Sequence, residues 1–123
     1  MMTGIVTADR EAIIVLTVCG PSGQDAVVDA VIDTGFDGSL TLPPALIARL
    51  QLPWRQRGRA LLADGSESVI DIHEASVVWD GRPVRVAVDA VEMVPLVGMR
   101  LLDGFTLTVQ VQVNGQVTIE ALP

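Results

Sequence analysis

The sequence has 123 residues, the size of one domain with a single hydrophobic core, so we expect one domain over residues 1–123. Half of the residues are hydrophobic but only 3% are aromatic, and the formal net charge is -7. An acidic surface repels phosphate groups, which argues against nucleic acid and against an anionic membrane as partners.

The first half of the chain alternates between strands and turns. Apolar residues predict a strand over 12–18, a turn over 20–24 and a second strand over Asp25–Ile32 that forms a hairpin with the first. This second strand leads directly into the loop 33–38 (DTGFDG), and residues 39–42 are expected to be extended. Two prolines then predict a helix over 44–50, because proline is favoured in the first helical turn.

The second half of the chain predicts three hairpins and a short helix. Strand character returns after Pro53, and residues 63–66 (ADGS) are typical of a hairpin tip. Strands are predicted over 68–79 and 82–90, joined by a two-residue turn, and a helix over 99–102. Alternating apolar residues over 105–113, followed by Asn-Gly at 114–115, predict a C-terminal hairpin with a type I′ turn. The fold class is therefore expected to be mostly β.

Asp33 is the candidate catalytic residue. It follows an apolar strand, and Thr34 and Gly35 after it indicate a turn that exposes the carboxylate and permits close approach of another backbone. Two carboxylates in contact cannot both ionise, so one serves as a base toward water and the other as an acid toward a carbonyl oxygen. The chain has one such loop, so the second carboxylate has to come from a second chain.

Three segments resemble the retropepsin-like aspartic proteases, which include the retroviral proteases and their bacterial relatives. These are 31–35 (VIDTG), 63–66 (ADGS) in the position of the flap, and 95–98 (PLVG) leading into 99–102 (MRLL). The phenylalanine and aspartate after the glycine resemble the bacterial branch. The resemblance implies a closed acid-protease-type β-barrel with one or two short helices, a single-lobe subunit that pairs as a homodimer.

The resemblance also implies roles for individual residues. Asp33 is the implied catalytic aspartate, Thr34 holds the two loops together across the dimer, and Gly35 admits backbone and substrate. The implied substrate-binding residues are Phe36, Asp37, Ala63, Asp64, Gly65, Ser66, Val97 and Gly98. The implied reaction is hydrolysis of a peptide or protein substrate, bound as an extended strand beneath the flap, by an activated water without metal or cofactor.

Other interpretations of the same residues stay open. A catalytically inactive homodimer that binds extended peptides would carry the same groove, and a monomeric, inert β-barrel could contain the same turn. Asp33 and Asp37 as metal ligands of a phosphatase loop are discounted, because that family places its two aspartates two residues apart rather than four.

The residue types present once or not at all narrow the chemistry further. The absence of lysine excludes a Walker-type phosphate loop and Schiff-base catalysis. Cys19 is the single cysteine and His73 the single histidine, so an internal disulfide is excluded and no spacing of zinc ligands is visible. A Cys19–His73 catalytic pair is a weak alternative. No export signal is visible, so a soluble cytoplasmic protein is expected. Arginines at 55, 57 and 59 predict a solvated strand edge or a contact with an acidic partner.

Overall fold

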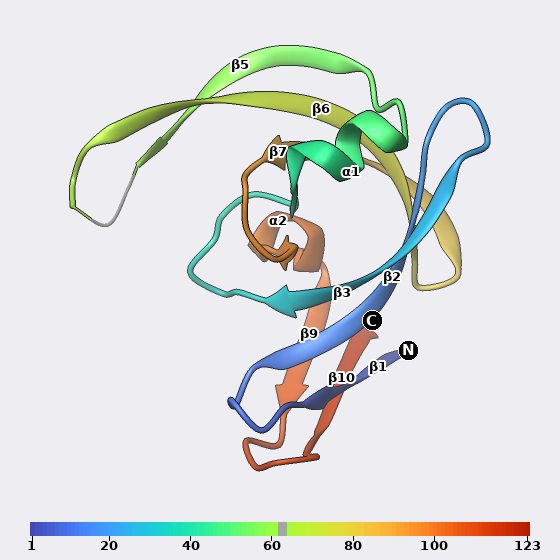
Figure 1. The fold of residues 1–123 in the computed structure, drawn as a ribbon. Coiled ribbons are helices and arrows are strands. Elements are labelled where there is room, and N and C mark those ends of the chain that lie inside the picture. The colour runs from blue at the N-terminus through green and yellow to red at the C-terminus, as the bar shows by residue number, and fades with distance from the viewer. Residues whose placement is uncertain (62–63) are drawn as a thin grey trace.

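The computed structural model describes residues 1–61 and 64–123, which form one ten-stranded sheet with two short helices (Figure 1). The prediction of a mostly β fold is confirmed. The strands are β1 (Met2–Val6), β2 (Ala12–Cys19), β3 (Asp25–Ile32), β4 (Leu40–Leu42), β5 (Trp54–Leu61), β6 (Glu67–Trp79), β7 (Arg82–Ala90), β8 (Leu96–Val97), β9 (Phe105–Val109) and β10 (Gln116–Ala121). The helices are α1 (Pro44–Arg49) and α2 (Met99–Leu102).

The strand order across the sheet is β5-β6-β7-β4-β8-β3-β2-β1-β10-β9. Two neighbouring pairs are parallel, β3 with β8 and β4 with β7, and the others are antiparallel. Strand β2 also pairs with β6 through Val18↔Val77 and Cys19↔Ser76. Pairing therefore runs from β2 through β3, β8, β4, β7 and β6 and back to β2, while the closed barrel as such stays a prediction.

The core consists almost entirely of branched aliphatic side chains. Successive side chains of a strand point to opposite faces, so Ile14, Leu16 and Val18 of β2 are buried while Val15 between them is 63% exposed. Burial of each such side chain contributes roughly 1.5–3 kcal/mol. The aromatic residue of the core is Trp79, and the ring of Phe105 packs edge-on against it.

Several local predictions are confirmed. Strand β3, strand β7 and helix α2 have the predicted bounds, and α1 ends one residue earlier than predicted. Asp80 and Gly81 both have positive φ, 52° and 79°, and Trp79 pairs with Arg82, as a two-residue type I′ turn requires. The N-cap of α1 is Pro43 in an extended conformation, so the helix begins at the second of the two prolines.

The predicted type I′ turn at residues 114–115 is wrong. Val109 pairs with Val117, and residues 110–115 connect β9 and β10 in place of a two-residue turn. The reason is β1, which has no counterpart among the predicted strands. The N–H of Val6 donates to the carbonyl of Gly115, and the N–H of Asn114 donates to the carbonyl of Val6, both at 2.9 Å. The segment before β10 is therefore held by β1 in addition to its own hydrogen bonds, such as that from the Gly115 N–H to the Gln112 carbonyl at 2.8 Å.

Within the described residues, neither helix has the length and apolar character that crossing a membrane would require.

Candidate active site

Asp33 is the first residue after β3, where this strand lies parallel to β8. Val31 pairs with Leu96 and Ile32 with Val97, and the N–H of Asp33 extends the ladder by donating to the Val97 carbonyl at 2.9 Å. The Asp33 side chain is half-buried, and its Oδ1 accepts the N–H of Gly35 at 2.9 Å. Its Oδ2 accepts no hydrogen bond from the described residues. One carboxylate oxygen is thus held by the loop itself and the other is left for an outside donor.

Backbone hydrogen bonds join the loop of residues 33–39, here called the Asp33 loop, to α2. Three N–H groups around the start of α2 donate to loop carbonyl oxygens: Gly98 to Ser39 at 3.0 Å, Met99 to Phe36 at 2.8 Å and Arg100 to Gly38 at 3.1 Å. Within the loop, Phe36 donates to the carbonyl of Asp33 at 3.2 Å. The first turn of a helix has N–H groups without partners in the helix, and here the Asp33 loop satisfies them.

Phe36 is packed between two glycines. A Cβ on Gly98 would lie 2.5 Å from Cδ2 of Phe36 and 2.7 Å from its carbonyl oxygen, and closer still to the carbonyl oxygen of Gly38. A Cβ on Gly38 would lie 2.5 Å from Cζ of the same ring. Gly98 is buried and Val97 is fully buried, so both lie beneath the Asp33 loop. Only glycine permits this close approach of α2 to the loop.

Thr34, Gly35 and Asp37 of the Asp33 loop are exposed. Asp37 also lies near Asp89, a half-buried carboxyl at the end of β7 that was not among the predicted site residues. Burial raises the pKa of the Asp89 carboxyl above its ordinary value, and the negative charge of Asp37 raises it further. The available sequence signal was an aspartate that directly follows the apolar run of residues 86–88.

The predicted flap is the tip of the β5–β6 hairpin. Ala63 lies outside the described residues, and Asp64, Gly65 and Ser66 are exposed. Oδ1 of Asp64 accepts the hydroxyl of Ser66 at 2.6 Å and its N–H at 2.9 Å, and these bonds hold the pKa of Asp64 below its ordinary value. In Figure 1 this tip and the Asp33 loop project from the same side of the molecule.

The arginines of β5 pair with carboxylates of β6. The arginines are exposed on an edge strand, as predicted, and Trp54 on the same strand is exposed as well. Each arginine faces one acidic residue: Arg55 pairs with Glu74, Arg57 with Asp71 at 3.7 Å and Arg59 with Glu67 at 3.3 Å. The described contacts of these arginines are therefore within the hairpin, and they link its two strands.

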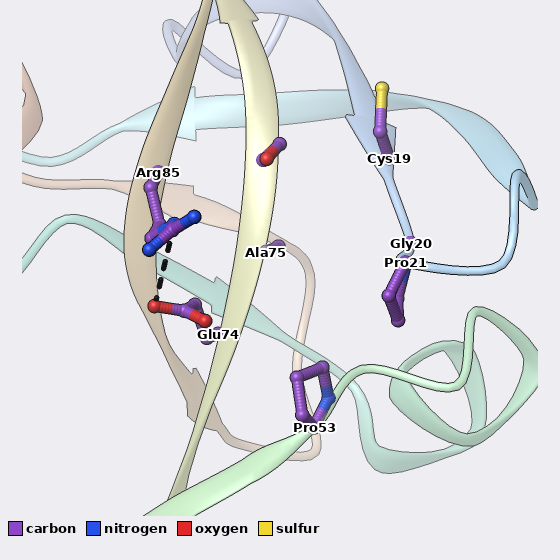
Figure 2. A pocket seen from close by; sticks show the side chains of 8 residues that line it. Cys19, Gly20, Pro21, Pro53, Glu74, Ala75 and Arg85 are labelled. Carbon is purple, nitrogen blue, oxygen red and sulfur yellow. Dashed lines mark ion pairs between the residues drawn. The ribbon is translucent and has the colours of Figure 1, made fainter.

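A separate pocket of about 240 Å³ surrounds Cys19. Figure 2 shows the Cys19 sulfur directed away from the ion pair of Glu74 and Arg85 across the pocket. Burial and the nearby Asp25 raise the pKa of the Cys19 thiol, which lowers its reactivity. The ring of His73 instead lies with Nδ1 3.0 Å from the Leu52 carbonyl. Nothing in these contacts supports a Cys19–His73 pair.

Among residues 1–61 and 64–123, no three His, Cys, Asp or Glu side chains are grouped as metal ligands would be.

No model of a protein family matches the chain, and no curated protein matches it. Among solved structures, the chain is similar to EIAV protease complexed with the inhibitor HBY-793, with a TM-score of 0.55. The match covers 77% of this chain and 88% of that chain at 17% sequence identity. The chain has a retropepsin-like fold. At this identity the likeness establishes the fold alone.

Proposed function

We propose that the chain is one subunit of an aspartic endopeptidase that pairs with a second copy through the Asp33 loops. The observation that carries the proposal is the Asp33 carboxylate at the end of the parallel pair β3 and β8. It is partly exposed, oriented by the Gly35 N–H and left with one oxygen that accepts no hydrogen bond from the described residues. The similarity in fold to a protease that binds an inhibitor supports the same conclusion.

The proposed reaction needs only the two Asp33 carboxylates and a water. When they share one proton, the ionised carboxylate removes a proton from water and the protonated one donates to the substrate carbonyl oxygen. Thr34 is exposed beside Asp33, where its hydroxyl can contact the second copy. At Gly35 a Cβ would meet only Oδ1 of Asp33 within 4 Å, so this face of the loop is open to a substrate backbone. No metal or cofactor takes part.

We propose that the substrate is an extended peptide with apolar side chains next to the cleaved bond. Val31 and Leu96 lie opposite each other in register, each next to a residue that faces the core. Both are half-buried on the outer face beside Asp33, and Val94 nearby is 58% exposed. This apolar strip suits alternate side chains of a strand-like peptide.

The remaining predicted site residues take two proposed roles. Exposed Asp37 and the tip residues Asp64, Gly65 and Ser66, with Ala63 beside them, contact the substrate. Phe36, Val97 and Gly98 are packed beneath the Asp33 loop, so they act mainly by positioning it.

Three finer assignments belong to the same proposal. The pairing of β2 with β6 supports a closed barrel. The sequence DTGFDG, with its phenylalanine packed between two glycines, supports the bacterial branch of the retropepsin-like proteases. The single cysteine, which has no disulfide partner in the chain, supports a cytoplasmic location.

The test is cleavage of an unbiased peptide mixture between about pH 4 and 7, a range that brackets a dyad sharing one proton. Products are identified by mass spectrometry for the wild type, Asp33→Asn and Asp29→Asn. Asp29 is the matched control because it is an exposed aspartate on the same strand. We expect cleavage to fall by at least about a thousandfold in Asp33→Asn and to persist in Asp29→Asn.

The second candidate is an inactive homodimer that binds extended peptides. The apolar strip of Val31 and Leu96 favours it equally, because peptide binding there needs no dyad. A sizing column and peptide-binding titrations separate the two functions. A dimer that binds peptides and cleaves none of them selects the binding module, and a monomer that does neither contradicts both candidates.

A further inference from the structure

A pocket of about 630 Å³ lies between the β6–β7 turn, strand β7, helix α2 and the start of β9. This volume is in the range of roughly 300–1,000 Å³ that small-molecule sites occupy. Neither Asp33 nor the tip of the β5–β6 hairpin lines it. Any ligand of this pocket is therefore separate from the proposed dyad.

The inner wall of the pocket is formed by core residues. Trp79, Val86 and Leu101 are 4%, 7% and 6% exposed, and Phe105 lies beside them. The rings of Trp79 and Phe105 meet edge to face, with their centroids 5.8 Å apart at an angle of 80°. This wall offers an apolar ligand a preformed surface.

Trp79 also supplies a hydrogen-bond donor without an acceptor. Its Nε1 is buried and has no hydrogen-bond partner among the described residues. Buried polar groups of native proteins are nearly always paired, because burial without a partner carries the full cost of desolvation. Trp79 lines the pocket through its ring, and because solvent does not reach Nε1, the indole N–H is a reporter of this wall rather than a contact for a ligand.

Positive charge is concentrated at the same pocket although the chain has a net charge of -7. Arg82 and Arg100 line it and form no ion pair with the described carboxylates, whereas Arg85 pairs with Glu74 at 3.7 Å. The carboxylate of Asp80 is held by the N-terminal ammonium group at 2.9 Å. That leaves Asp103 as the acidic side chain that opposes an anion here.

We propose that this pocket binds a small amphipathic carboxylate. Its apolar body lies against Trp79 and Phe105, and its carboxylate pairs with Arg82 and Arg100. Two sources present this chemistry: the C-terminus of a peptide that ends in an apolar residue, and an aliphatic acid. The site does not depend on the proposed peptidase activity, because it shares no residue with the dyad.

The experiment uses the indole N–H of Trp79 as a reporter of ligand binding to the pocket wall. In a ¹⁵N-labelled Trp54→Phe protein, Trp79 is the single tryptophan, so one indole resonance reports the site. N-acetyl-leucine represents the peptide source, octanoate the aliphatic source, and N-acetyl-leucinamide is the uncharged control. We expect a saturable shift of the indole resonance with at least one carboxylate, and at least about tenfold weaker binding of the amide. The acid that binds more tightly identifies the source.

Charge variants in the same background sharpen the test. Arg82→Gln and Arg100→Gln should each weaken binding about fivefold or more, and Asp103→Asn should strengthen it. Arg49→Gln, on the exposed end of α1, is the matched control and should leave affinity unchanged. Two results would overturn the proposal: no saturable shift at millimolar concentrations of either acid, or equal binding of the acid and the amide. Both results are measured on the Trp54→Phe protein, which keeps all its arginines, so they do not depend on how the arginine variants fold.

Discussion

The Asp33 loop and the β5–β6 hairpin belong to the same predicted site but are held in different ways. The Asp33 loop is joined to α2 by three backbone hydrogen bonds, and its phenylalanine packs against a buried glycine. The β5–β6 hairpin is exposed along most of its length, and its described side-chain contacts are mainly ion pairs between its own strands.

The difference separates a fixed element from a movable one. Backbone hydrogen bonds around a close-packed glycine have no alternative arrangement without a clash, whereas an exposed ion pair contributes only about 0–1 kcal/mol. Segments with few buried contacts open first in a folded protein. The Asp33 loop therefore suits the precise placement of a carboxylate, and the hairpin suits a cover that opens to admit a substrate.

Among the variants that test this difference, Gly98→Ala is expected to lower the free energy of unfolding the most. The added Cβ would meet the Phe36 ring and the carbonyl oxygens of Gly38 and Phe36 well inside van der Waals contact, and the two oxygens are backbone atoms that cannot move aside. We expect a loss of about 3 kcal/mol or more in the free energy of unfolding, measured by urea denaturation.

Gly35→Ala is the matched control in the same loop. Its Cβ would meet only Oδ1 of Asp33, at 3.2 Å, and a side-chain oxygen can shift. The free energy of unfolding should fall by about 1 kcal/mol or less in Gly35→Ala. Equal destabilisation by the two variants would mean that the loop is not held by the approach of Gly98.

Arg55→Gln tests the hairpin side of the comparison with a smaller expected effect. Arg55 pairs with Glu74, which is 25% exposed and also faces Arg85. We expect a loss of at most about 1 kcal/mol, together with faster hydrogen exchange of β5 and β6 amides and unchanged exchange in the Asp33 loop.

Arg59→Gln is the control within the hairpin, because both members of its ion pair are more than half exposed. Its effect should be smaller than that of Arg55→Gln. Faster amide hydrogen exchange in the Asp33 loop of either variant would show that the hairpin and the loop are coupled. The distinction between a fixed loop and a movable hairpin would then be wrong.

The parts of the fold that the sequence predicted are those with a local signal. Strands β3 and β7 show their alternation, and Asp80–Gly81 contains a residue pair suited to positive φ. Strand β8 has two residues, so its pairing with β3 has no local pattern to reveal it. Strand β1 is short and contains Gly4, where a side chain would meet the backbone of Ile13. Such strands are defined by their partners.

The same division holds for the candidate site. The position of Asp33 followed from an apolar strand that runs into DTG, and the structure places the carboxylate at that strand end. The packing of Phe36 against Gly98 and the nearness of Asp37 to Asp89 join segments far apart in the chain. No periodicity encodes them, because they arise when α2 and β7 are brought to the loop.

Asp89→Asn should change the free energy of unfolding the least, and it should raise this free energy where the other variants lower it. Burial, and then the charge of Asp37, raise the folded-state pKa of Asp89 above its ordinary value of 3.8. The unfolded chain therefore loses this proton at a lower pH than the folded chain, so ionised Asp89 destabilises the fold at neutral pH. We expect Asp89→Asn to gain about 0.5 kcal/mol at pH 7, a small value because the carboxyl is only half-buried and is screened by solvent.

The pH dependence of that gain distinguishes charge from packing. Well below pH 3.8, at about pH 2, Asp89 is protonated in both the folded and the unfolded state, so the difference in melting temperature between wild type and Asp89→Asn should disappear there. Asp37→Asn should give a smaller gain over the same pH range, because it removes only the second of the two causes. A gain that is independent of pH would mean that the asparagine packs better. Charge repulsion beside the Asp33 loop would then not be the cause.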